Sequence, residues 1–158
     1  MKTLLLFIIC LFSTAIHSAA LVHPTIMKME HSGLIGEKGS LEPVPYKLTV
    51  EYADKKSVWD SNDQKISKLA LVVNGTEMKL NDHLYKDLAG VHIPSITVAY
   101  VQLWGEMSSI KLYIPYGKTK SCKNHDSGVT NYLQSKEILI FSLSGNFKEA
   151  IKKHACEY

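Results

Sequence analysis

The dipeptide Asn74-Gly75 limits the fold of this chain more than any other feature, because it separates two short apolar runs. Asparagine and glycine both tolerate the positive φ angles that a two-residue type I′ hairpin turn requires. Apolar residues fill positions 69–73 before the turn, and Met78 and Leu80 continue the pattern after it. The stretch "LALVVNGTEMKL" therefore predicts an antiparallel β-hairpin.

Further strands are predicted by alternation or by runs of β-branched and aromatic residues. In residues 46–52, Tyr46, Leu48, Val50 and Tyr52 share one face. Three more strands are expected at residues 96–104, 110–115 and 138–143, and the first and last of these are apolar on both faces. A strand that is apolar on both faces is typical of a central position covered from both sides. Residues 25–31 are expected to be a short extended piece, and residues 118–131 a polar loop.

Two helices are expected beside this sheet. Residues 81–90 favour a short helix, capped by Asn81 or Asp82 and closed by Gly90. A last helix begins at Asn146, where Glu149 completes a pattern similar to a capping box. Its apolar face consists of Phe147, Ala150, Ile151, His154 and Ala155. We therefore predict an α+β fold: one domain with an antiparallel sheet of five or six strands, a short middle helix and a C-terminal amphipathic helix.

The first twenty residues have the three parts of a secretory signal peptide. A positive start at Lys2 is followed by an apolar run over residues 4–12, and residues 13–20 end in small side chains. The run is too short to cross a bilayer permanently. We expect cleavage after Ala20, with Ser18 as the alternative, and a single domain over residues 21–158. The mature protein is expected outside the cytoplasm, either periplasmic or secreted, with no membrane span after the signal is removed.

Cysteine usage agrees with export. Cys10 falls inside the predicted signal peptide, which leaves Cys122 and Cys156 in the mature chain. An exported chain with two cysteines indicates one disulfide between them.

The basic residues restrict the class of partner. The chain contains 18 basic residues, all of them lysine, against 15 acidic residues, for a formal net charge of +3. Without arginine there is no bidentate contact with phosphate or guanine. We do not expect a nucleic-acid partner.

The stretch "NHDSG" at residues 124–128 combines residue types found in catalytic sites. However, His125, Asp126 and Ser127 are consecutive, so their side chains diverge, whereas a triad needs histidine between the other two groups. No nucleophile elbow is present. We predict no catalytic residue and leave one alternative open, a small secreted hydrolase in which two of the six mature histidines meet in space.

The new N-terminus carries the one candidate metal cluster. Cleavage after Ala20 makes His23 the third residue, so a free amine, two amides and an imidazole could surround copper(II). Met27, Met29 and His31 share one face if this piece is extended, and thioethers suit copper(I). Copper is therefore the only cofactor considered, as an alternative to none.

Taken together, these residues predict a small exported binding protein that is not an enzyme. It is expected to act through its surface on another extracytoplasmic protein or a glycan. The hint for a contact surface is a set of aromatic residues: Tyr52, Trp59, Trp104, Tyr113, Tyr116 and Tyr132. The alternatives are a copper-binding protein and a hydrolase. Asn74 also begins a glycosylation sequon, which matters only in a eukaryotic cell.

Overall fold

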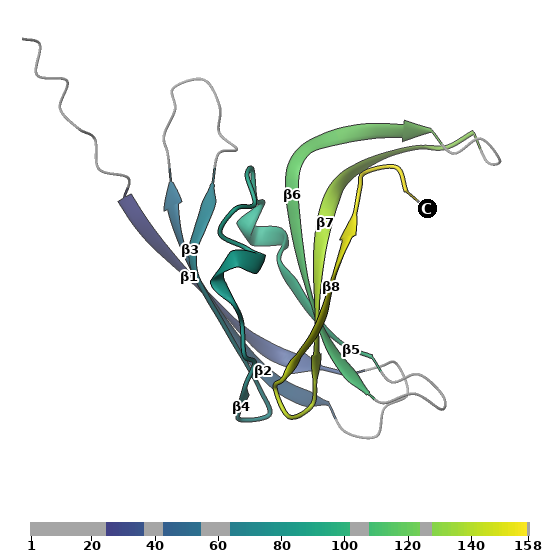
Figure 1. Cartoon of the computed structure of the whole chain (residues 1–158). Coiled ribbons are helices and arrows are strands. Elements are labelled where there is room, and N and C mark those ends of the chain that lie inside the picture. The colour runs from purple at the N-terminus through teal and green to yellow at the C-terminus, as the bar shows by residue number, and fades with distance from the viewer. Residues whose placement is uncertain (1–24, 37–42, 55–63, 102–107, 124–127, 158) are drawn as a thin grey trace, which may run out of the picture.

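The computed structural model describes residues 25–36, 43–54, 64–101, 108–123 and 128–157, and it contains two four-stranded antiparallel sheets (Figure 1). The first sheet has the order β1 (Thr25–Ile35), β2 (Val44–Asp54), β3 (Lys65–Val73) and β4 (Thr76–Glu77). The second has the order β5 (Thr97–Val101), β6 (Ser109–Lys123), β7 (Thr130–Ser142) and β8 (Phe147–Lys153). Within each sheet, neighbours in space are also neighbours in sequence.

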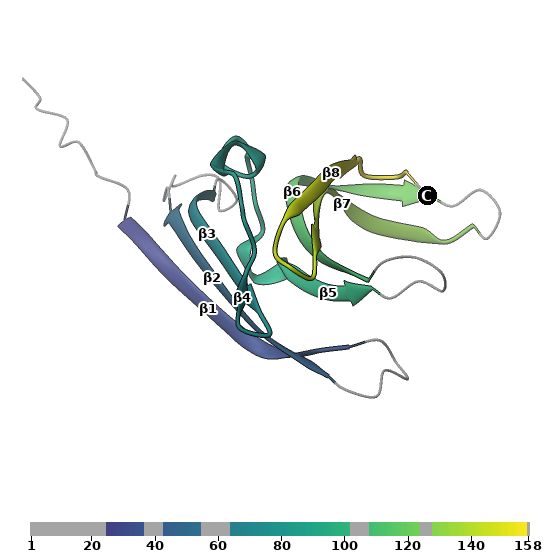
Figure 2. The same ribbon diagram turned by 60° about the horizontal axis from the view of Figure 1, so that its bottom comes forward.

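One core joins the two sheets. They diverge like the arms of a V, and the segment that links β4 to β5 runs between them (Figures 1 and 2). That segment contains two short 3₁₀ turns, η1 (Asp82–Leu84) and η2 (Ile93–Ser95). The core takes side chains from the first sheet, the second sheet and the linking segment, for example Leu48 and Leu71, Leu112 and Leu139, and Tyr85 and Val91.

The predicted hairpin is confirmed. Asn74 and Gly75 have φ angles of 48° and 75°, and Val73 pairs with Thr76 across the turn. The return strand β4 is short, because the backbone N–H of Lys79 donates instead to the carbonyl of Gly145, between β7 and β8. Gly145 has a φ of 81°, and a Cβ there would lie 2.4 Å from the Glu77 carbonyl oxygen. This close approach fastens the end of the hairpin to the second sheet.

The predicted α+β class is wrong, since the described residues form two sheets and no α-helix. Residues 147–153, which make up most of the C-terminal helix predicted to begin at Asn146, are β8. They pair with residues 136–141 of β7, and the ring of Phe147 meets that of Phe141 edge-on at 5.9 Å. A helix of about ten residues is barely stable alone. As a strand, the segment instead satisfies the N–H and C=O groups along the outer side of β7.

The middle helix predicted at residues 81–90 is also absent, apart from the single turn η1. Asn81 makes no capping side-chain hydrogen bond. The backbone from Ala89 to His92 bonds to the sheets instead: Val91 N–H donates to the Gln64 carbonyl, and His92 N–H to that of Pro115. Tyr85 and Leu88 reach the core from this irregular path, so the segment needs no helix to bury its apolar residues.

The number and length of the strands also differ from the prediction of five or six. The expected loop at residues 118–131 belongs partly to the β6–β7 hairpin, since β6 continues to Lys123 and β7 begins at Thr130. Residues 124–127 lie outside the described residues. β5 was expected to be covered on both faces, but it is a half-buried strand at the edge of the second sheet.

Candidate functional site

A pocket of about 390 Å³ opens between the inner face of the second sheet and the η1 turn. One wall comes from β7 and β8, and the other from the segment that links the sheets. The lining mixes apolar side chains with ionisable ones: Leu84, Leu88 and Ala150, together with His83, Asp87, Glu137 and Lys152.

The strand register points Glu137 into this pocket. Glu137 lies opposite Ile114 of β6, and Leu139 lies opposite Leu112. Because side chains alternate along a strand, Glu137 shares its face with Leu139 and Phe141, which are fully buried. The Glu137 side chain is only 3 % exposed. A carboxylate therefore occupies a position where the pattern of the sheet calls for an apolar residue.

Few polar groups surround this carboxylate. Oε2 of Glu137 has no hydrogen-bond partner within the described part of the chain. The nearest cation, Nζ of Lys152, is 4.0 Å away at the end of a side chain that is 64 % exposed. Burial raises the pKa of Glu137, and the charge of Lys152 only partly opposes this effect. Buried polar groups normally have partners, so an unpaired buried carboxylate needs a reason.

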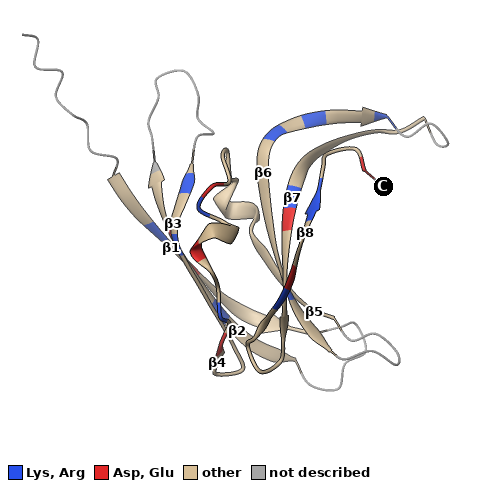
Figure 3. Ribbon diagram, in the orientation of Figure 1, with Lys and Arg blue, Asp and Glu red and all other residues tan. Residues whose placement is uncertain are grey.

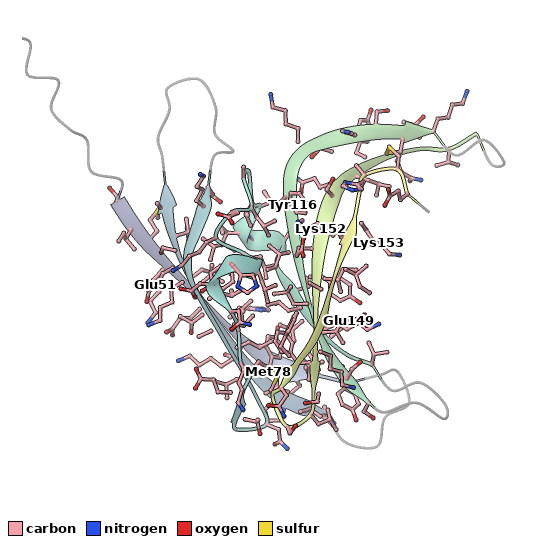
Figure 4. All side chains as sticks on the ribbon, in the orientation of Figure 1. Glu51, Met78, Tyr116, Glu149, Lys152 and Lys153 are labelled. Carbon is pink, nitrogen blue, oxygen red and sulfur yellow. A yellow bond between two sulfur atoms is a disulfide. The ribbon has the colours of Figure 1, made fainter. Side chains whose placement is uncertain are left out.

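Lys152 belongs to the pocket, and the next residue along the chain does not. Lys152 lies opposite Glu137 in the register, on the inner side of β8. In Figure 4, Lys152 lies on the side of the sheet that also carries Tyr116, whereas Lys153 and Glu149 lie on the other side. Lys153 and Glu149 thus resemble pocket residues in charge and strand but point away from the pocket.

The opposite wall is held by a small hydrogen-bond cluster in η1. The buried Tyr85 hydroxyl donates to Oδ1 of Asp82 at 2.6 Å, and Lys86 bonds to the other carboxylate oxygen of Asp82. Burial and this hydrogen bond raise the pKa of Tyr85 to about 12, so the phenol stays protonated and keeps donating. The contacts of Lys86 and Tyr85 hold the pKa of Asp82 below its usual value. The turn therefore presents His83 and Asp87 to the pocket on a fixed backbone.

The cysteine pair predicted from the sequence is present. Cys122 and Cys156 are joined by a disulfide, with their Cα atoms 5.3 Å apart and a sequence separation of 34. Cys122 lies in β6 opposite Asn131 of β7, and Cys156 follows the end of β8. The bond therefore fastens the end of the chain to the β6–β7 hairpin.

Three of the four candidate metal residues lie on the first sheet and do not line the pocket. Strand β1 places Met27, Met29 and His31 on one face, and the Nδ1 of His31 is hydrogen-bonded to the Tyr46 hydroxyl at 2.8 Å. His23 lies outside the described residues. Within them, no group of three or more His, Cys, Asp or Glu side chains is arranged to hold a metal. Copper binding remains a prediction.

The other predicted sites are only partly described. Asn74 is exposed at the tip of its hairpin, and its glycosylation stays a prediction. His125, Asp126 and Ser127 lie outside the described residues, as do Trp59 and Trp104. Of the other aromatic residues, Tyr52, Tyr113 and Tyr116 are half-buried and Tyr132 is exposed. Among the described residues, the ring of His31 bonds to the Tyr46 hydroxyl and that of His92 to the Ser95 hydroxyl. The hydrolase alternative, which requires two histidines or a histidine and a carboxylate in contact, stays a prediction.

The sequence-based reasoning missed Glu137 completely, although a signal was available. The predicted strand began at Ile138, the first residue of an apolar run. Extending its alternation backwards by one residue places Glu137 in line with Leu139 and Phe141. A charged residue on the apolar face of a strand is the pattern that identifies this site.

Comparison with known proteins adds no information: no family model, no curated protein and no solved structure matches this chain. None of the described helical segments is long and apolar enough to cross a membrane. The function therefore has to be argued from the pocket itself.

Proposed function

We propose that the protein is an exported, non-enzymatic binding protein that holds a small amine in the pocket beside Glu137. One observation carries the proposal: a buried carboxylate faces the pocket with an oxygen that accepts no hydrogen bond from the described residues. An ammonium group brings the opposite charge and up to three donors, so it supplies both of the missing interactions.

The rest of the pocket suits the remainder of such a ligand. A volume of about 390 Å³ lies in the range of small-molecule sites. Leu84, Leu88 and Ala150 offer apolar surface to a short hydrocarbon or aromatic body, and Asp87 adds a second negative charge. The proposal thus narrows the general expectation of surface binding to one concave site.

The position of Lys152 supports this proposal, because its side chain can move away from Glu137 when a ligand binds. Its ammonium group is at the outer limit of an ion pair with Glu137, on a long and mostly exposed side chain. At this distance, and with a mobile partner that is mostly in solvent, Lys152 satisfies the buried carboxylate only poorly. A ligand ammonium could replace it, while Lys152 moves into solvent at little cost.

Export is supported by two features. The apolar N-terminal run has the form of a signal peptide, and a disulfide such as Cys122–Cys156 persists in oxidising compartments outside the cytoplasm.

The test compares three ligands of one shape by titration calorimetry: phenethylamine, its neutral analogue 2-phenylethanol and the anion 3-phenylpropionate. We expect the amine to bind most tightly. The Glu137→Gln variant should weaken amine binding roughly 10- to 100-fold, because a hydrogen bond to a charged group is worth about 1.5–3 kcal/mol.

The matched control is Glu149→Gln, which removes the same charge from β8 on the opposite side of the sheet. It should leave the affinity for the amine unchanged. Equal binding of the amine and the alcohol, or equal effects of the two substitutions, contradicts the proposal.

A further inference from the structure

In the described part of the chain, the outer edge of the first sheet is the strand β1. β1 pairs with β2 along one side only, and no described strand pairs with its other side. It is eleven residues long, contains no proline, and keeps an unbroken register with β2 from Thr25↔Asp54 to Ile35↔Val44. A long regular edge offers a row of free N–H and C=O groups to another strand.

The strands at the other three edges are shorter or less regular than β1. β4 has two residues and β5 has five. β8 is interrupted by a register shift and carries three lysines, which repel a second copy of the same strand. Of the seven large apolar side chains that are exposed in the described part of the chain, three belong to β1: Ile26, Met27 and Leu34.

We propose that β1 pairs with β1 of a second copy of this chain, in antiparallel register centred on Met29, to form a dimer with one continuous eight-stranded sheet. A twofold axis perpendicular to the sheet keeps the inner faces of both copies on the same side. In this geometry, two residues lie opposite each other when their numbers add up to twice the number of the central residue. It therefore allows only a few registers to be compared.

Charge selects the register. Lys28 and Glu30 lie on the outer face of β1, where they form an ion pair at 2.8 Å, and Lys47 lies 3.4 Å from Glu30. Centring the pair on Met29 places Lys28 opposite Glu30 of the second copy, and the reverse, so both contacts are attractive. Centring on Lys28 or on Glu30 opposes like charges, which destabilises a sheet.

The same register covers apolar surface on the inner face. Met29 lies opposite Met29 of the second copy, and Met27 lies opposite His31. Met27 is 43 % exposed in the single chain. Because this face continues the core-facing side of the sheet, the pairing removes thioether surface from water as well as satisfying the free edge.

The test measures the oligomeric state of the mature protein by sedimentation velocity over a wide concentration range. We expect a reversible dimer. Lys28→Glu and Glu30→Lys should each weaken the dimer by roughly tenfold or more, because each converts two attractive cross-strand pairs into two repulsive ones. An equimolar mixture of the two variants should dimerise again, because the two acidic side chains of one variant then lie opposite the two lysines of the other.

Lys148→Glu on β8 is the matched control, with the same charge reversal on the other long edge, and it should leave the dimer unchanged. The unfolding midpoint of each variant shows whether it is folded. A wild-type protein that is monomeric at every concentration overturns the proposal. So does a mixture that fails to regain the dimer, because it contradicts the register on which the proposal rests.

Discussion

The inner faces of the two sheets follow the same alternating apolar pattern, yet they differ in one position. In the first sheet, Leu48 and Val50 of β2 pack against the apolar residues of β3, and none of the buried side chains described there is charged. In the second, Glu137 lies in line with Leu139 and Phe141 and is the one buried charged side chain in the described part of the chain. A charged residue among apolar neighbours goes against the local pattern of the strand, and such departures are expected at functional sites.

The two sheets also differ in what fixes them. The first is organised by local signals, among them the Asn74-Gly75 turn. The second contains the β6–β7 hairpin, which is bent by a register shift between Tyr116 and Lys120 and fastened to the chain end by the disulfide. Basic residues lie along the strands of this hairpin and along β8 (Figure 3). The second sheet thus carries the pocket and the tertiary constraint, and the first carries the free edge.

The largest expected effects test whether the two sheets share one core. Leu48→Ala in the first sheet and Leu139→Ala in the second each remove a side chain with 0 % exposure. Each should lower the free energy of unfolding by about 2–5 kcal/mol. Urea unfolding followed by both fluorescence and circular dichroism should give a single transition for either variant. Two separate transitions would show that the sheets unfold independently.

Removing the disulfide should act on the second sheet. The double variant Cys122→Ala and Cys156→Ala opens a loop closed by residues 34 apart. The chain-entropy model gives a loss of stability of roughly 3–4 kcal/mol. Hydrogen exchange should increase first in the β6–β7 hairpin and β8, while β2 and β3 keep their protection. If protection were lost equally in both sheets, the disulfide would not be specific to the second sheet in its effect on stability.

Replacing Glu137 by leucine makes the second sheet resemble the first. Burial raises the pKa of Glu137 above its ordinary value of 4.5, so the folded protein holds this proton more tightly than the unfolded chain. Below pH 4.5 the residue is protonated in both states and carries no penalty. As pH rises from 4.5 through the raised pKa, the wild type loses stability, because the folded state accommodates the charged carboxylate less well than the unfolded chain does.

Glu137→Leu should not lose that stability, and it should also abolish amine binding. Chemical unfolding of the wild type and the variant at about pH 4 and at neutral pH measures the difference. If the two proteins respond to pH in parallel, Glu137 is not the titrating group. The Glu149→Leu variant, which changes an exposed carboxylate of β8, should follow the wild type.

The smallest expected effect concerns Lys152. If its ammonium group competes with the ligand for Glu137, then Lys152→Gln should raise the affinity for phenethylamine by a few-fold, because the pair is long and only its lysine partner is mobile in solvent. Lys153→Gln makes the same change of charge on the outer side of β8 and should have no effect. Calorimetry at low salt gives the clearest comparison, because salt screens exposed charges. A decrease in affinity for Lys152→Gln would mean that Lys152 contacts the ligand directly.

The sequence was most informative where neighbouring residues determine the backbone. The turn at Asn74-Gly75, the alternation in β2 and the extended piece that became β1 all depend on residues only a few positions apart. The cysteine pair also followed from the sequence, since two cysteines in an exported chain leave one pairing. These features need no knowledge of what lies beside them.

The segment at residues 147–153 shows where this reasoning fails. Its residues fit an amphipathic helix as well as a strand, and the free side of β7 decided between them by offering hydrogen bonds and a contact with Phe141. Residues 81–90 form only short local turn bonds, and the backbone that follows is held by partners far away in sequence, such as Gln64 and Pro115. Secondary structure that depends on a distant partner cannot be read from local pattern alone.

By itself, then, the sequence determined the turns, the strands with clear alternation and the pairing of its two mature cysteines, because these depend on local backbone preference or on composition. Only the tertiary structure decided that β8 is a strand, that two sheets share one core, and that Glu137 faces a pocket with Lys152. The physical reason is that burial and hydrogen-bond partners are properties of neighbours in space. For Glu137, the nearest cation is 15 residues away in sequence but 4.0 Å away in the folded protein.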